Sequence, residues 1–162
     1  MPTAHKQGFS LVEILVFITI LSVFFVVAVS VSIASIKYMK INEHKILATR
    51  YAEDALEWLR GEKDKDWDTF VTYASTFGTT YCFNNPVPSD PSVSLNSISS
   101  GITCNKNGIT GHSPQIFKRE VTLTTEGSGS SIYQVHVSIK VSWDELGTEY
   151  SVPIDTVFSV WE

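Results

Sequence analysis

Residues 9–36 read FSLVEILVFITILSVFFVVAVSVSIASI and decide the architecture of this 162-residue chain. Glu13 is the single charged residue of this stretch, and no charge follows between Ile14 and Ile36. A helix needs roughly 20 consecutive apolar residues to cross a bilayer. The stretch therefore predicts one membrane-spanning helix close to the N-terminus.

Two ordinary explanations fit this stretch incompletely. A cleaved signal peptide has an apolar region of only about 7–15 residues, which is shorter than the run observed here. A plain membrane anchor accounts for the length but not for Glu13. A carboxylate inside a membrane helix costs at least a few kcal/mol and is usually functional, with a partner.

The segment before the helix supplies a third explanation. A short polar leader that carries Lys6 ends at Gly8, and Phe9-Ser10-Leu11-Val12-Glu13 follows. This arrangement resembles the type IV pilin and pseudopilin family. The resemblance implies that a membrane peptidase cleaves after Gly8 and that the new N-terminal residue, Phe9, is N-methylated. It also implies that Glu13 pairs with the terminal amine of a neighbouring subunit.

Physical chemistry supports that role for Glu13. A carboxylate in a bilayer or in the packed core of a filament needs a cation, and the amine of Phe9 is the nearest candidate type. An amine from an adjacent subunit could meet Glu13 at only one axial offset, so the pair would fix register more than it adds stability.

The charges that flank the apolar run favour the opposite membrane orientation. Lys6 lies on the leader side, whereas Lys37, Lys40 and Lys45 follow the run, and cytoplasmic flanks usually carry the excess of lysine and arginine. Long C-terminal domains translocate largely regardless of flanking charge, so we still expect residues 37–162 to lie outside the cytoplasm.

The helix is expected to continue beyond the membrane. Small and apolar residues recur at helical spacing among charged ones, and Gly61 is a plausible stop. These residues are Ile41, Ala48, Ala52, Ala55 and Leu59. The continuation is therefore predicted to be amphipathic and to rest on a sheet, with Trp67, Phe70, Tyr51 and Trp58 covering the junction between helix and sheet.

Period-two alternation at 117–123, 135–143 and 150–158 predicts three antiparallel strands. The predicted class is α+β, a pilin-like helix on a small antiparallel sheet. The segments are the leader 1–8, the apolar helix 9–36, its amphipathic continuation 37–61, an αβ-loop region 62–114 and the sheet 115–162. The last hairpin and the helical stretch ATRYAEDALEWLR also resemble minor pilins.

Cys82 and Cys104 either form one disulfide, if the domain lies outside the cytoplasm, or are two unrelated thiols. They lack metal-ligand spacing. The alternating Asp64, Asp66 and Asp68 lack the glycine turn and distal glutamate of a calcium loop. A second acidic group consists of Asp144, Glu145, Glu149 and Asp155. It could gather a calcium ion, as in some pseudopilins, but it does not clearly match the ligand pattern of that family. We therefore predict no metal and no cofactor.

The remaining features bear on function. A net charge of −5 and a pI near 5.3 give no strong sign of nucleic-acid binding, and no catalytic fingerprint appears. The sequence predicts a non-enzymatic minor pilin or pseudopilin of a pilus, type II secretion or DNA-uptake machine. Its expected partners are other pilin subunits, the prepilin peptidase, an inner-membrane assembly platform and, before assembly, membrane lipid.

A second interpretation stays open. The chain could instead be a monomeric adhesin or binding module held on the membrane by its helix. Such a module needs neither the Gly8–Phe9 junction nor Glu13. Either interpretation gives a single-pass inner-membrane protein with an extracytoplasmic C-terminal domain. The first one adds a periplasmic or cell-surface filament.

Overall fold

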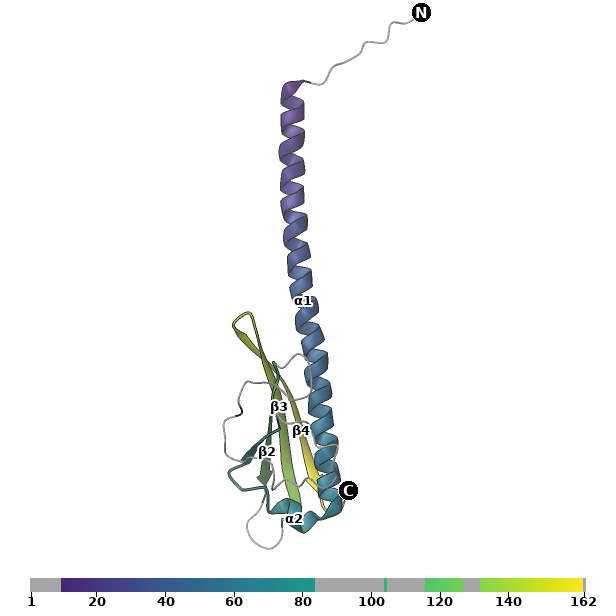
Figure 1. Cartoon of the computed structure of the whole chain (residues 1–162), viewed down its shortest axis with the longest axis vertical. Coiled ribbons are helices and arrows are strands. Elements are labelled where there is room, and N and C mark those ends of the chain that lie inside the picture. The colour runs from purple at the N-terminus through teal and green to yellow at the C-terminus, as the bar shows by residue number, and fades with distance from the viewer. Residues whose placement is uncertain (1–9, 84–103, 105–115, 127–131, 162) are drawn as a thin grey trace, which may run out of the picture. The chain divides into compact units, whose positions relative to one another are not determined.

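The computed structural model describes residues 10–83, 104, 116–126 and 132–161 (Figure 1). The helices are α1 (Leu11–Lys65) and α2 (Trp67–Val71). The strands are β1 (Thr79–Cys82), β2 (Lys118–Thr125), β3 (Gln134–Glu145) and β4 (Thr148–Ser159). The chain divides into two compact units, Met1–Asn42 and Glu43–Glu162.

The described part of the first unit is helical and apolar. Large hydrophobic side chains on every side of the helix are exposed, from Leu21 at 40% to Leu11 at 78%. A helix that is apolar all round must be covered by lipid or by other protein. By length and composition α1 is also long and apolar enough to cross a membrane.

The second unit contains one antiparallel sheet of four strands in the order β1-β2-β3-β4. β3 pairs with β4 over their whole lengths, from Gln134–Ser159 to Glu145–Thr148. β2 and β3 alternate between buried and more exposed side chains because successive residues of a strand point to opposite faces. One face of the sheet therefore supplies the core.

The C-terminal part of α1 covers that face (Figure 1). Three of its buried positions are alanines, which let the backbone approach the strands closely. The buried residues of this part of α1 are His44, Ala48, Tyr51, Ala52, Ala55 and Leu59. The strands contribute fully buried aliphatic residues such as Val121, Leu123 and Ile139. The predicted α+β arrangement of a long N-terminal helix on an antiparallel sheet is confirmed.

The aromatic residues expected at the junction lie there. Phe70 of α2 is buried, and its ring centroid lies 6.0 Å from that of Phe158 on β4. Tyr51 contacts Phe117 edge-on at 5.2 Å, and Trp58 contacts Phe83 at 5.4 Å. These ring contacts join the helices to the sheet and to the segment after β1.

Two sequence-based expectations were wrong in detail. The helix does not stop at Gly61 but continues to Lys65, where Lys65 pairs with Glu62 one turn earlier. Gly61 has open space around its α-carbon, so nothing there forces a break. The sheet has a fourth strand, β1, which pairs with β2 inside the region expected to be a loop.

Candidate functional site

Glu13 lies in the first turn of α1, which begins at Leu11. The amides of Glu13 and Ile14 donate to the carbonyl oxygen of Ser10 at 3.0 and 3.3 Å, closing the first helical turn. A carboxylate in this position interacts favourably with the helix dipole. Gly8 and Phe9, the predicted cleavage and methylation positions, lie outside the described residues.

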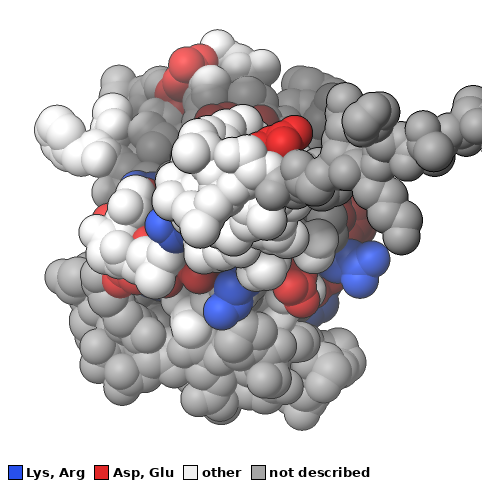
Figure 2. Space-filling view, turned by 90° about the horizontal axis from the view of Figure 1, so that it is seen from above, with Lys and Arg blue, Asp and Glu red and all other residues white. Residues whose placement is uncertain are grey.

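The surface that surrounds Glu13 is apolar. Neighbouring side chains such as Leu11, Val12 and Ile14 are more than half exposed. Figure 2, which is viewed from above, shows the N-terminal end of α1 as a largely uncharged surface. A charge on such a surface must be matched by a cation once lipid or protein covers it, because an unpaired buried charge is expensive.

The hydroxyl side chains of the apolar part of α1 bond to the helix itself. Ser30, Ser32 and Ser35 donate to the carbonyl oxygens of Val26, Ala28 and Val31, each at 2.9 Å. Ser22 donates to Thr19 at 2.8 Å. These hydroxyls therefore need no outside partner, and the helix surface stays compatible with an apolar environment.

Cys82 at the end of β1 forms a disulfide with Cys104, with the two Cα atoms 5.3 Å apart. The residue after Cys82, Phe83, is buried and continues the pairing with β2, since its amide donates to the carbonyl oxygen of Arg119 at 2.9 Å. The disulfide thus ties Cys104 to β1 at the edge of the sheet.

Arg119 is a buried cation in the core beside this disulfide. Its Nε donates to the carbonyl oxygen of Phe83 at 3.0 Å, and one terminal nitrogen donates to the carbonyl oxygen of Tyr51 at 2.7 Å. One side chain therefore connects α1, β2 and the segment after β1. Burial lowers the pKa of Arg119 to about 10, against a smaller opposing effect of Asp54 and Tyr51, so the side chain stays charged at neutral pH.

Arg119 occupies an inward-facing position of the alternating pattern at 117–123, between Phe117 and Val121, and the sequence analysis assigned it no role. The sequence signal that could have revealed its role is a charged residue at an inward position of an alternating strand. Such a residue needs a partner in the core.

His44 and Glu145 form a second polar contact in the core. His44 Nδ1 lies 2.9 Å from a carboxylate oxygen of Glu145, and both side chains are largely buried. The rings of Phe117 and Trp143 meet His44 edge-on at 5.8 and 6.4 Å. This contact links α1 to the end of β3.

The four acidic residues considered for calcium do not come together. Asp144 and Glu149 face each other across the β3–β4 hairpin, whereas Asp155 pairs with Ser138, six residues further along β4. Six residues of strand span about 20 Å. Across the described residues, no group of three or more His, Cys, Asp or Glu side chains could hold a metal ion.

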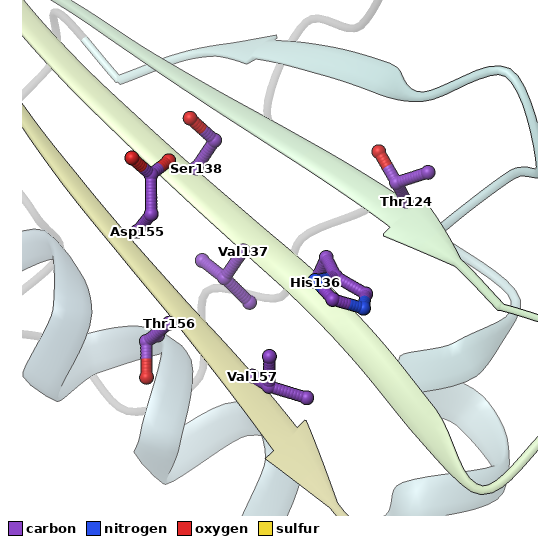
Figure 3. Close-up of a pocket in the computed structure, with 7 residues that line it drawn as sticks. All are labelled: Thr124, His136, Val137, Ser138, Asp155, Thr156 and Val157. Atoms are coloured by element: carbon purple, nitrogen blue, oxygen red, sulfur yellow. The ribbon is translucent and has the colours of Figure 1, made fainter.

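A shallow pocket of about 200 Å³ lies on the sheet between β2, β3 and β4 (Figure 3). His136, Asp155 and Ser138 contribute polar atoms and Val157 an apolar wall. His136 Nε2 lies 2.9 Å from a carboxylate oxygen of Glu126.

A comparison with models of protein families gives a match at the N-terminus. Residues 3–36 match a family model described as "Prokaryotic N-terminal methylation motif". The match covers residues 3–8 of the leader, Phe9, Glu13 and the apolar part of α1. The searches of curated proteins and of solved structures found no match.

Proposed function

From the type IV prepilin signature carried by residues 3–36, we propose that this chain is a structural minor pilin or pseudopilin subunit of a type IV pilus-like filament. The signature supports a type IV pilin-like subunit in general, and that family is structural rather than enzymatic. The filament itself would be a pilus, a type II secretion pseudopilus or part of a DNA-uptake machine.

The observation that carries the proposal is the combination of Glu13 with the exposed apolar surface of α1. The apolar part of the helix offers side chains on all sides that must be covered, first by lipid and then by neighbouring helices. Glu13 is the one charge in this surface. In a filament core it would pair with the amine of Phe9 of the adjacent subunit and so set the axial offset between helices.

Processing and location follow from the same signature. The motif implies cleavage by a prepilin peptidase and assembly with other pilin subunits. In our proposal cleavage follows Gly8, Phe9 becomes the methylated terminus, and an inner-membrane platform assembles the subunits. The unit Glu43–Glu162 lies outside the cytoplasm, where its disulfide is stable.

A monomeric membrane-anchored adhesin is the second candidate. The shallow pocket near His136 and Asp155 is the feature that favours it. A monomeric anchor, however, has no use for a carboxylate in its apolar surface, and retaining one is costly. The two candidates therefore differ in what happens when Glu13 is removed.

The test is the Glu13→Ala variant, expressed beside wild type in the native host. Removing the carboxylate leaves membrane insertion unchanged or slightly favoured, but it abolishes the pairing that sets register. We expect a processed, membrane-resident protein that is strongly depleted from sheared filaments, as measured by immunoblot of the filament and membrane fractions.

Glu43→Ala is the matched control, because Glu43 is an exposed carboxylate on the same helix outside the apolar run. This variant should enter filaments like wild type. Equal incorporation of Glu13→Ala and Glu43→Ala would contradict the assembly role, and an absence of filaments containing wild-type protein would favour the monomeric adhesin.

A further inference from the structure

β4 lies at one edge of the sheet and pairs with β3 on its inner side. Among the described residues, no strand pairs with its outer side, which we call the free edge of β4. The strand is 12 residues long, Thr148–Ser159. A long free edge presents main-chain amides and carbonyl oxygens that can pair with another chain. This edge is therefore a place where two copies of the protein could join.

The hydrogen bonds between β3 and β4 fix which amides of β4 point to the free edge. The amide of Val160, just after β4, donates to the carbonyl oxygen of Tyr133, just before β3, at 3.3 Å. β3 and β4 pair one-to-one along their whole lengths. In an antiparallel ladder every second residue bonds to the same neighbour. The even-numbered residues of β4 therefore bond to β3, and the odd-numbered residues point their main-chain groups to the free edge.

The turn between the two strands gives the same assignment. Leu146 and Gly147 have φ values of 52° and 82°, as in the two-residue type I′ turn of a hairpin. In such a hairpin the residues that flank the turn exchange their main-chain hydrogen bonds. These residues are Glu145 and Thr148. Thr148 is even-numbered, so both ends of β4 agree.

Pro153 stands near the middle of β4, at an odd-numbered position, and is exposed. Its nitrogen points to the free edge and carries no hydrogen, so the ladder with β3 loses no hydrogen bond. The free edge, in contrast, loses the donor between those of Ser151 and Asp155. Within a sheet, proline is confined to positions of this kind.

Charge limits the ways in which two copies of β4 could pair edge to edge. Identical strands related by a twofold axis pair antiparallel. An axis at Glu149 or at Asp155 would place two carboxylates directly opposite each other, which is unfavourable. Axes at Pro153 and at Ile154 avoid opposing like charges and pair nearly the whole strand. Pro153 occupies a hydrogen-bonding position in both registers, because it faces Pro153 of the second copy in the first and Asp155 in the other.

We propose that Pro153 closes the free edge of β4 against a second copy of this chain. In either register the two prolines remove two hydrogen bonds close to the axis, where a pairing of two strands would be centred. Without Pro153, two copies would join their sheets through β4. The inference goes beyond the proposed function and does not depend on it, because it concerns the unit Glu43–Glu162 alone.

The test is the Pro153→Thr variant of the full chain, purified in detergent beside wild type. Threonine restores the amide and favours strands. Hydrogen exchange is measured amide by amide at low and high protein concentration, so association through α1 does not affect the readout. In wild type the outward amides of Ser151 and Asp155 should exchange rapidly at both concentrations. In Pro153→Thr they should slow about tenfold at high concentration only.

Pro153→Asp is the matched control. Aspartate restores the same amide, but it would face a carboxylate of the second copy in either register, and like charges directly opposite are destabilising. Its outward amides should therefore exchange as rapidly as those of wild type. The inward amides of Val152 and Ile154 report on folding and should stay slow in all three proteins, because the nitrogen of residue 153 takes no part in the ladder with β3.

Three results would overturn the proposal. Slow exchange of Ser151 and Asp155 in wild type would mean that the edge is already covered. Exchange in Pro153→Thr that does not change with concentration, or that equals Pro153→Asp, would mean that Pro153 prevents no pairing. Loss of protection at Val152 and Ile154 in Pro153→Thr would mean that residue 153 faces β3 and not the free edge.

Discussion

Replacing Arg119 with alanine should destabilise the unit Glu43–Glu162 substantially. The side chain is 1% exposed and makes two hydrogen bonds to main-chain carbonyl oxygens, those of Tyr51 and Phe83. Hydrogen bonds from a charged group contribute about 1.5–3 kcal/mol each. The cost of burying the charge, which also lowers the pKa of Arg119 to about 10, offsets part of this. We expect the free energy of unfolding to fall by about 3 kcal/mol, since the alanine also leaves a cavity.

Arg119→Met separates the two contributions. Methionine keeps much of the volume but donates no hydrogen bond, so the carbonyl oxygens of Tyr51 and Phe83 lose their donor, while the cost of burying a charge disappears. We therefore expect a loss of about 2 kcal/mol, which is smaller than that of Arg119→Ala because the cavity is largely filled.

The assay is urea unfolding of the full chain in detergent, followed by tryptophan fluorescence. Trp58 reports on this region because its ring lies 5.4 Å from that of Phe83. Arg60→Ala is the matched control, since Arg60 is an exposed arginine of α1 that pairs with Glu57. Its loss should change the unfolding free energy by less than about 1 kcal/mol. A result for Arg119→Ala equal to that of Arg60→Ala would refute the reasoning.

Two further predictions concern the same unit. Replacing Cys82 and Cys104 together with serine should lower the free energy of unfolding by about 3 kcal/mol in the chain-entropy model. An unchanged urea midpoint, or free thiols that alkylate in protein taken from outside the cytoplasm, would count against the disulfide. Asp66→Ala should speed hydrogen exchange at the Thr69 amide, because Asp66 caps α2 and accepts from the amides of Asp68 and Thr69. A hydrogen bond from the Thr69 hydroxyl, and then those from the amides of Thr69 and Asp68, lower the pKa of Asp66. The stabilisation of α2 by the Asp66 cap is therefore present above the ordinary pKa of 3.8 and is lost as pH falls through the lowered pKa. A protection factor of the Thr69 amide, corrected for the intrinsic exchange rate, that stays constant over this range would be inconsistent with the cap.

The parts of the fold with long, regular patterns could be predicted from the sequence. The apolar run and the spacing of Ala48, Ala52 and Ala55 predict α1, and the alternation in β2, β3 and β4 predicts the sheet. Burial of one helix face and one sheet face produces both patterns.

The missed elements are short and depend on tertiary contacts. β1 has four residues, and its strand conformation comes from pairing with β2. α2 has five residues and depends on the Asp66 cap and on the packing of Phe70. The helix continues past Gly61 to Lys65, and the pair of Lys65 with Glu62 three residues earlier supports this last turn by a small and local effect that the sequence pattern does not reveal.

Of the polar residues described above, the sequence singled out Glu13 but not Arg119. Glu13 was found because a lone charge in an apolar run is conspicuous. The role of Arg119 was not, because its partners are main-chain oxygens of Tyr51 and Phe83, which are 68 and 36 residues away in the sequence. Any residue type can offer a main-chain carbonyl oxygen, so the partners of Arg119 cannot be predicted from residue identity.

The central claim is that the chain is a processed type IV pilin-like subunit. Intact-mass and N-terminal analysis of the protein extracted from membranes of its native host tests it most directly. We predict a chain that begins at Phe9 and carries one methyl group on its terminal amine, and a Gly8→Val variant that keeps the leader and stays unmethylated. Wild-type protein that retains Met1 and residues 2–8 would contradict the account.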